Sequence, residues 1–432
     1  EISACLVGSE MCIRDRQRSA KDRQGAGRIV MGATDRKKVL ILGGSRLQAP
    51  AIEVAKRLGF WVICADYDPD AVGFALADQS ELISTLDAEA VLALAKRERV
   101  AFVITSTSDA PVRTASFVSE QLDLPVGISY ADSICATHKD AMRRRLAKYN
   151  VPIPEFRVCS NLDEFVEALN YFEYRCIIKP ADSAASRGVK LIDSSIRHDD
   201  PEELFERGMS FSRKRTLMVE RCISGTEVSV EGMTVNGKTH ILAITDKMVT
   251  EPPYFVELGH SEPALLEDAE KVRIEDVARA AIEAVGIVNG PSHTEIMITD
   301  SGPMVIEIAA RLGGDYITSR LVPLSTGFDM VGASVELALG MPVDFPPPKQ
   351  DGSAVRFIVS DTGVISDIKI DSAIYDLPGF EELELYKKSG DAISEPHSSN
   401  DRVGHVICTG PDALSARETA EKALSMIHVS LS

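Results

Sequence analysis

Residues 290–315, GPSHTEIMITDSGPMVIEIAARLGGD, place one glutamate on each of two strand-like runs that a turn joins. The turn sequence TDSGP is typical of a hairpin, so we expect Glu295 and Glu307 to lie on antiparallel neighbours. The second run is mostly apolar, and a lone carboxylate there would be costly to bury without a cation. Two adjacent carboxylates followed by Arg311 therefore indicate one or two hard cations. The alternative is two partly exposed glutamates that pair with Arg311.

The length and composition of the chain limit the classes of protein to which it can belong. The 432 residues exceed what one hydrophobic core usually organises, so we expect two or three domains. No apolar run approaches the roughly 20 residues that span a bilayer. A net charge of −18 argues against nucleic acid and membrane partners, but it leaves room for a small anionic ligand held by local basic groups. The eight cysteines include no CxxC pair, so reduced thiols and a cytoplasmic location are expected.

Residues 1–35 have no sustained period, and Met31 looks like a better start than Glu1. We interpret this segment as a non-native or disordered extension, with a native disordered arm as the alternative.

Residues 36–128 show a repeated strand and helix pattern. KKVLILGG, WVICADYDP and VAFVITSTSD read as buried strands, and residues 49–59 as a helix, which predicts a small parallel sheet with helices on both faces. Gly43, Gly44 and Ser45 do not complete a GxGxxG fingerprint. A close turn that needs small residues is therefore favoured over a dinucleotide site, despite Asp66 at the end of the second strand.

The remaining chain alternates strands and helices. A helix is expected at residues 138–150 with Thr137 as its cap and Tyr149 on its apolar side, and Pro152 and Pro154 mark a boundary. Residues 346–432 begin within the expected linker FPPPK (345–349) and are rich in strand patterns. They end in a helix predicted at residues 413–428.

The loop ADSAASRGV at residues 181–189 is rich in small side chains and follows Lys179. Such loops let backbone amides approach phosphate oxygens, while the lysine supplies a point charge. Ser183 and Ser186 belong to this loop. A plain flexible hairpin is an equally good interpretation of the loop alone.

Further polar residues stand in irregular runs. Glu220 and Glu227 flank a turn at a spacing that suits an exocyclic amine and a ribose diol, or they are edge-strand charges. Lys247, Glu257 and His260 border a loop that contains two prolines, and binding residues concentrate in loops. His260 could instead be an ordinary core or surface histidine.

Four separated motifs now stand in order: Lys139 near a helix start, IIKP with its small-residue loop, VERCISGTE, and HTE with VIEIAARLGG. Together they resemble the ATP-grasp superfamily over about residues 37–345. The resemblance implies a mixed α/β and α+β fold. Its parts would be a doubly wound, parallel-sheet pre-ATP-grasp domain at 36–128, a two-lobed ATP-grasp domain at 129–345 with a mobile lid at about 155–222, and a β-rich C-terminal subdomain at 346–432.

The resemblance also implies ATP and Mg²⁺ (or Mn²⁺) as cofactors. Lys139 and Lys179 would bind the phosphates, and the loop with Ser183 and Ser186 would close over them. Adenosine would be held by Glu220, Arg221, Ile223 and Glu227. The metal ligands would be Glu295 and Glu307, whereas Ala309 stands where many members have an additional asparagine ligand.

The variants EIAAR and VELGH look like the branch that joins amino acids or other carboxylates to amines, including L-amino-acid ligases and carbamoyl-phosphate-synthase-like enzymes. Arg311 and Lys179 would be the catalytic groups, with Arg311 gripping the carboxylate or acyl phosphate. Glu257 and His260 would face the ammonium group or the incoming amine. Asp315 suggests a larger or cationic substrate. The expected activity is ATP-dependent ligation through an acyl phosphate, releasing ADP and phosphate, and a homodimer is compatible with it.

Three alternatives stay open. The same scaffold could phosphorylate bicarbonate or a nucleotide-pathway carboxylate. The chain could bind ATP as a non-catalytic regulatory or assembly protein, which Ala309 favours. A NAD-dependent oxidoreductase built on the first strands is the most distant alternative.

Overall fold

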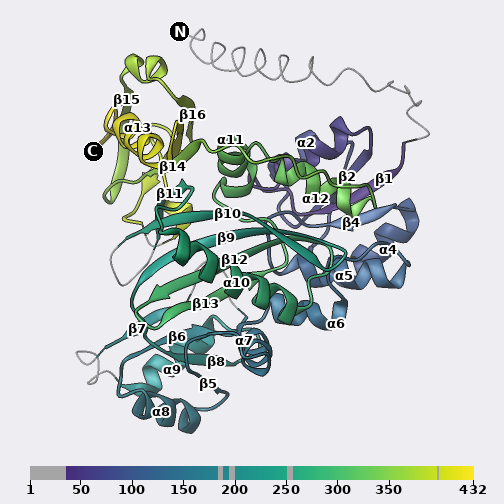
Figure 1. The fold of residues 1–432 in the computed structure, drawn as a ribbon, viewed down its shortest axis with the longest axis vertical. Helices are drawn as coiled ribbons and strands as arrows, with labels where there is room; N and C mark the ends of the chain where they lie inside the picture. Colours follow the sequence, from purple (N-terminus) through teal and green to yellow (C-terminus); the bar gives the residue numbers. More distant parts are fainter. Residues whose placement is uncertain (1–35, 183–187, 194–199, 251–255, 397) are drawn as a thin grey trace. The chain divides into compact units, whose positions relative to one another are not determined.

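The computed structural model describes residues 36–182, 188–193, 200–250, 256–396 and 398–432. Residues Lys38–Ser432 form one compact unit (Figure 1). Within these described ranges, no helix is long and apolar enough to cross a membrane.

The first sheet is parallel, as predicted. It consists of β1 (Lys38–Leu42), β2 (Trp61–Asp66), β3 (Gln79–Leu82) and β4 (Phe102–Ile104), in the order β3-β2-β1-β4. Alternate residues of β1 face opposite ways because side chains alternate along a strand. Ile41 packs in a core with α2 (Ala49–Arg57), and Leu42 packs in another with α4 (Ala88–Glu98) and α5 (Pro111–Gln121). Helices therefore cover both faces.

The turn after β1 is closed by an acid on β2. Asp66 Oδ2 accepts a hydrogen bond of 2.6 Å from the Gly44 amide, and Gly43 has a φ of +104°, where glycine is favoured. Gln48 occupies the space beside Gly43 that a Cβ would need. These contacts fit the predicted close turn, in which the Asp66 carboxylate accepts a hydrogen bond from a backbone amide.

The central sheet is antiparallel and has eight strands in the order β13-β12-β9-β10-β11-β14-β18-β16. Its members are β9 (Thr226–Val235), β10 (Lys238–Val249), β11 (Glu257–Glu262), β12 (Gly290–Thr299), β13 (Gly302–Ala309), β14 (Gly352–Ile358), β16 (Phe380–Leu385) and β18 (Gly404–Gly410). One face packs on α10 (Asp268–Val285) and α7 (Lys139–Lys148). The sheet thus runs from the predicted carboxylate hairpin into the C-terminal segment.

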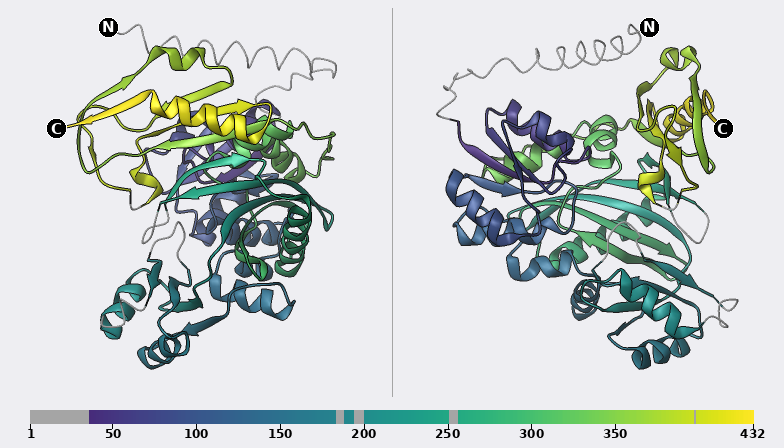
Figure 2. Two further views of the ribbon diagram at one scale, coloured as in Figure 1. Left: turned by 60° about the vertical axis from the view of Figure 1, so that its left-hand side comes forward. Right: turned by 180° about the vertical axis from the view of Figure 1, so that it is seen from behind.

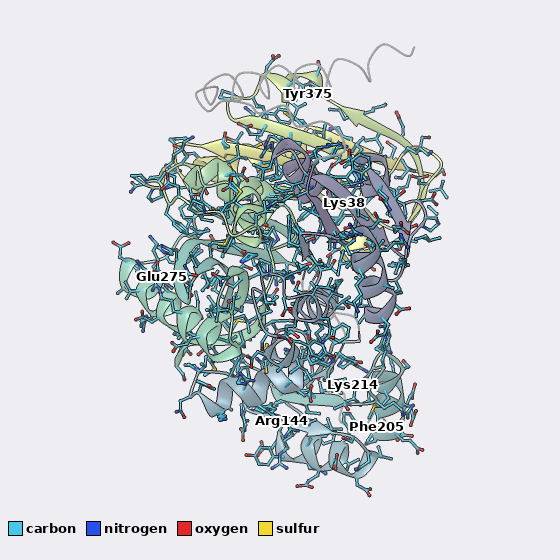
Figure 3. The ribbon with its side chains drawn as sticks, turned by 90° about the vertical axis from the view of Figure 1, so that its right-hand side faces the viewer. Lys38, Arg144, Phe205, Lys214, Glu275 and Tyr375 are labelled. Carbon is cyan, nitrogen blue, oxygen red and sulfur yellow. The ribbon has the colours of Figure 1, made fainter. Side chains whose placement is uncertain are left out.

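A smaller antiparallel sheet occupies the predicted lid. Its order is β5-β8-β6-β7, from β5 (Phe156–Cys159), β6 (Cys176–Pro180), β7 (Lys190–Ile192) and β8 (Leu217–Arg221). With α8 (Leu162–Tyr171) and α9 (Pro201–Ser210) it has a hydrophobic core of its own that includes Phe165 and Phe205 (Figure 3). A separate core is what allows such an element to move as a body.

The C-terminal segment is strand-rich, as predicted, but it is not a separate sheet. Three of its strands complete the central sheet through the pairing of β11 with β14. Three others, β15 (Gly363–Ile370), β17 (Ala392–Ile393) and β19 (Ile427–Leu431), form a second small sheet. Helix α13 (Ala413–Ser425) packs against β14 and β18 (Figure 2). The helix predicted at 413–428 is thus too long, because the strand β19 begins at Ile427.

Short helical segments complete the described chain: α3 (Val72–Leu76), α6 (Tyr130–Ser133), α11 (Val322–Thr326), α12 (Met330–Ala338), η1 (Ile134–Ala136), η3 (Ile317–Leu321), η4 (Ser372–Asp376) and η5 (Ser399–Asp401).

The start of α7 differs from the prediction. His138 is the N-cap, and the Thr137 hydroxyl instead donates to the Ser133 carbonyl at 2.9 Å, because η1 ends immediately before it. Tyr149 is 53% exposed rather than apolar-facing. Lys139 is the first residue of the helix.

Candidate active site

Glu295 and Glu307 lie directly opposite each other in the register of β12 and β13. The hairpin turn is stabilised by Thr299, whose hydroxyl donates to the Gly302 carbonyl at 2.8 Å. Because residues directly opposite each other in an antiparallel pair point to the same face, both carboxylates face the same side of the sheet. The predicted antiparallel neighbours are therefore confirmed.

Two ammonium groups compensate these carboxylates. Lys139 Nζ from α7 lies 2.5 Å from Glu307 Oε1. Lys247 Nζ from β10 lies 3.0 Å from Glu295 Oε1 and 2.7 Å from Glu227 Oε1, with Glu257 Oε1 at 3.7 Å. Although burial disfavours its charged form, the nearby glutamates hold the pKa of Lys247 well above its ordinary value. Lys247 is thus a buried cation among three acids.

A histidine that the sequence analysis did not assign joins this group. His293 Nδ1 lies 2.5 Å from Glu231 Oε1, and its Nε2 lies 3.7 Å from Glu295 Oε1. Burial alone would lower the pKa of His293, but Glu231 raises it to about 9. The signal was present in the motif HTE, whose first residue is two positions from Glu295 and hence on the same face of the strand.

Arg311 is anchored from the parallel sheet. Its Nε donates to Asp109 Oδ1 at 2.7 Å, and its Nη1 donates to the Leu312 carbonyl at 3.0 Å. Asp109 follows β4, and the sequence analysis gave it no role. Because the guanidinium group of Arg311 has further N–H donors, this anchoring leaves some of them available to bind a substrate.

Lys179 and Glu220 form a buried triad with Arg143. Lys179 Nζ lies 2.7 Å from Glu220 Oε2, and Arg143 pairs with the other carboxylate oxygen. Burial opposes ionisation, but Arg143 and Lys179 lower the pKa of Glu220 to about 2. Glu220 is therefore a fixed anion between two cations, and its predicted contact with adenine stays a prediction. Arg143 was missed, since its partner lies far away in the sequence.

The remaining predicted nucleotide contacts are less defined. Arg221 is exposed and pairs with Glu155 at 2.7 Å, and Ile223 follows in the connection to β9. Ser183 and Ser186 lie outside the described residues.

Glu257, His260 and Asp315 meet around an arginine from the C-terminal segment. Arg402 donates to both carboxylate oxygens of Asp315, at 2.8 and 2.9 Å, and to Glu257 Oε2 at 3.2 Å. His260 is buried, and its Nε2 lies 3.6 Å from Asp315 Oδ2, too far for a good hydrogen bond. Arg402 was not predicted, because it lies 87 residues beyond Asp315.

A cavity of about 890 Å³ brings most of these groups together. Polar residues after β2, β3 and β4 also face it, at the carboxyl ends of the parallel strands, where α/β proteins commonly bind ligands. The predicted site residues that line the cavity are Glu257, His260, Glu295, Glu307, Arg311 and Asp315. Lys139 and Lys179 are not among the described residues that line it, although Lys139 pairs with Glu307, which does.

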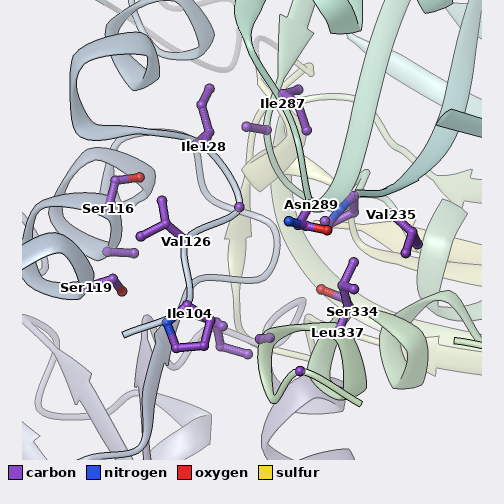
Figure 4. Close-up of a pocket in the computed structure, with 18 of the residues that line it drawn as sticks. Ile104, Ser116, Ser119, Val126, Ile128, Val235, Ile287, Asn289, Ser334 and Leu337 are labelled. Atoms are coloured by element: carbon purple, nitrogen blue, oxygen red, sulfur yellow. The ribbon is translucent and has the colours of Figure 1, made fainter. Parts of the chain in front are cut away.

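A second cavity, of about 610 Å³, lies between α5, α12 and the ends of β9 and β12 (Figure 4). It is lined by apolar residues such as Ile128, Val126 and Leu337 and by a few uncharged polar ones such as Asn289. None of the described residues that line it is charged, so it offers nothing to neutralise a phosphate. The carboxylate cavity is therefore the candidate active site.

One other acidic cluster was considered as a metal site. The ligand atoms of Glu382, Glu384 and His405 lie within 4.8 Å of one another. However, Arg320 Nε lies 3.0 Å from Glu382, and Arg46 pairs with Glu384. These arginines pair with the two carboxylates, and none of the three residues lines the carboxylate cavity, so we assign no metal there.

Comparisons with known proteins identify two domains in this chain. Residues 172–319 match the ATP-grasp domain, and residues 356–432 match the L-amino acid ligase C-terminal domain 2. The uncharacterized protein y4rH of Sinorhizobium fredii is 26% identical and covers 95% of this chain and 87% of its own length. The L-arginine-specific L-amino acid ligase of Bacillus subtilis is 23% identical over 69% of this chain and 72% of that protein. An L-amino acid ligase from Bacillus licheniformis superposes with a TM-score of 0.78 at 20% identity, over 92% of this chain and 99% of that one.

Residues 172–319 are therefore an ATP-grasp domain, as the sequence motifs indicated. The C-terminal segment, residues 356–432, matches the L-amino acid ligase C-terminal domain 2, and L-amino acid ligases are among the proteins to which the chain is similar.

Proposed function

We propose that the protein uses ATP to phosphorylate the carboxylate of an amino acid and joins the resulting acyl group to an amine, releasing ADP and phosphate. The observation that carries the proposal is the opposed pair Glu295 and Glu307 in one cavity with Arg311. Phosphoryl transfer to a carboxylate brings anions together, and such a site must hold them by positive charge.

The residues present fit a divalent cation. Glu295 and Glu307 carry like charges on directly opposed residues, and the ammonium groups of Lys247 and Lys139 compensate them. Carboxylate oxygens are also the ligands that Mg²⁺ prefers. We propose that they hold Mg²⁺ or Mn²⁺, which would neutralise phosphate charge when bound. Ala309 is buried opposite His293 and offers no ligand atom, so the protein ligands that we propose are these two glutamates.

The ATP phosphates are proposed to lie between Lys139 and Lys179, which come from α7 and from the lid strand β6. Glu227 would accept from the ribose, and the segment from Glu220 to Ile223 would face adenine. The lid has its own core and can close over the nucleotide, which would keep water from the acyl phosphate.

Arg311 is proposed to bind the substrate carboxylate. Asp109 fixes its Nε side, so the guanidinium presents its remaining donors without first losing conformational freedom. Glu257 and His260 are proposed to face the ammonium group of the substrate or the incoming amine. His260 supports this role, because both of its ring nitrogens are buried without a hydrogen-bond partner among the described residues.

The test is release of ADP from ATP by the purified protein, with a matrix of amino acids and small carboxylates, each with and without an amine. Signal that needs Mg²⁺, a carboxylate and an amine together would support the ligase. ADP release that ignores both organic substrates, or ATP binding without release under every condition, would contradict it. The Glu307→Gln variant is the control for contaminating ATPases.

A homodimer and a cytoplasmic location belong to the same proposal. Light scattering of the purified protein tests the dimer directly.

A further inference from the structure

Arg402 is an arginine of the C-terminal segment that pairs with two acidic residues of the candidate active site. It precedes β18, only 3% of its side chain is exposed, and its guanidinium carbon lies 3.6 Å from the centre of the Phe357 ring. An arginine this buried is expected only where its charge is compensated.

Its compensation comes entirely from the wall of the cavity. The Nη1 and Nη2 groups grip Asp315 in a bidentate pair at 2.8 and 2.9 Å. The Nε group donates to the Glu257 carbonyl at 3.1 Å, and Nη2 also reaches the Glu257 carboxylate at 3.2 Å. The guanidinium group of Arg402 is therefore bound by Asp315 and Glu257, which both line the cavity.

Asp315 is held in place for this contact. It has a φ of +50°, and the following Tyr316 has a φ of +65°, both in the left-handed region that non-glycine residues rarely adopt. Conformations of this kind persist where surrounding contacts over-determine them, often at functional sites. The bidentate pair with Arg402 supplies such a contact.

The pairing of Arg402 with Asp315 changes the charge that the wall of the cavity presents to a substrate. Asp315 lies four residues after Arg311 and lines the same cavity, so it faces the remainder of a carboxylate substrate that Arg311 holds. Taken from the sequence alone, Asp315 suggested a larger or cationic substrate. With Arg402 in place, this wall presents a compensated carboxylate instead of a free negative charge, so a cationic side chain gains nothing from approaching it.

We propose that Arg402 is a specificity-determining residue: by neutralising Asp315, it makes the enzyme select carboxylate substrates with an uncharged side chain over those with a cationic one. This inference rests on the proposed ligase function. It assigns to the C-terminal segment a role in choosing the substrate.

The test compares L-norleucine with L-lysine, which have side chains of similar length and differ chiefly in the terminal ammonium group. Each serves as the carboxylate substrate, with ATP, Mg²⁺ and hydroxylamine as the amine, and the hydroxamate formed gives kcat/KM. The wild-type protein is expected to prefer norleucine. In Arg402→Gln the ratio of kcat/KM for norleucine to that for lysine should fall about tenfold or more, because an uncompensated carboxylate now faces the substrate.

Two further variants test the cause. The double variant Arg402→Gln with Asp315→Asn removes the uncompensated charge, so its ratio should return toward that of the wild type. Asp315→Asn alone removes the carboxylate that Arg402 binds in a bidentate pair and should raise the ratio, and this near-isosteric change keeps the inference testable if Arg402→Gln does not fold. Arg417→Gln is the matched control, since Arg417 is an exposed arginine of the same segment that pairs with Glu421.

The outcomes separate the two proposals. A wild-type protein that forms no hydroxamate with any carboxylate contradicts the ligase function itself. A wild-type protein that forms hydroxamate but prefers lysine, or whose ratio is unchanged in folded Arg402→Gln and Asp315→Asn, overturns the role of Arg402 alone.

Discussion

Glu307 is the more accessible of the two opposed glutamates, with 36% of its side chain exposed, and Lys139 is its protein partner. Replacing Glu307 by Gln should lower ADP release by about 10²-fold or more, because one preorganised charge that serves phosphoryl transfer is lost. The melting temperature should change little, since the residue is not in a core. Steady-state ADP release checks the activity, and Glu275→Gln, on the outer face of α10, is the control. Near-normal turnover would remove the metal role of Glu307.

Arg311 offers a second test at the residue scale. Arg311→Ala should reduce carboxylate-dependent ADP release by about 10²-fold or more, the loss expected for one charge-stabilising donor. Asp109→Asn should have a smaller effect in the same direction, because it only loosens the position of Arg311. Initial rates at varied carboxylate concentration check both variants. An unchanged carboxylate response in Arg311→Ala would contradict its role as the carboxylate grip.

Glu262 predicts a pH dependence of stability. It is fully buried and accepts hydrogen bonds from Thr245 at 3.0 Å and from Ser325, and burial raises its pKa from 4.5 to about 8. The folded protein therefore keeps a proton that the unfolded chain loses, so stability is highest below about pH 4.5 for this group and falls as the pH rises toward 8. Glu262→Gln should remove that loss, and its stability relative to the wild type should increase between pH 5 and 8 by on the order of 1–3 kcal/mol. Denaturant unfolding at several pH values measures the difference, and a constant difference would contradict the prediction.

The candidate site divides into residues that local patterns reveal and residues that they do not. Glu295, Glu307 and Arg311 stand within one short stretch whose turn and apolar runs fix their relation. Asp109 is 202 residues from Arg311, and its role depends on how the two sheets approach each other. A single sequence carries no local signal for such a contact, and the same holds for Arg402.

At the scale of elements, Gly225 marks the passage of the chain from the lid strand β8 to the central strand β9. A Cβ at this position would lie 2.0 Å from the Ile298 carbonyl oxygen of β12. Gly225→Ala should therefore destabilise the protein by about 1–3 kcal/mol, because backbone has to move. Chemical unfolding measures this, and Gly314→Ala is the control, since its Cβ would meet only Leu47, at 3.8 Å. Equal stabilities of the two variants would contradict the account.

Elements whose partners are close in sequence were predicted well, and those with remote partners were not. The hairpin of β12 and β13 followed from its turn, and the parallel strands followed from their apolar runs. The pairing of β11 with β14 joins segments about ninety residues apart, as in the register of Ser261 with Ala354. The apolar pattern of β14 predicted a strand, but nothing in it specified which strand would be its neighbour.

At the scale of the whole molecule, four motifs in a particular order predicted both the fold class and the enzyme class. Their order along the chain follows the order of the lobes. The domain boundaries stay predictions. The continuity of the central sheet into the C-terminal segment shows why boundaries are hard to place from composition, since a linker such as residues 345–349 need not separate two sheets.

The position of Lys247 among Glu227, Glu257 and Glu295 has a consequence for how the protein matures. The chain carries its own counter-ion for the acidic site, so folding does not have to wait for metal loading, in contrast to domains whose ligands stay unfolded without their ion. Treatment with a chelator should abolish ADP release and leave the melting temperature within about 2 °C of the untreated value. Lys247→Met should make that temperature depend on added Mg²⁺. A large drop for the wild type on chelation would show instead that the metal is part of the folded architecture.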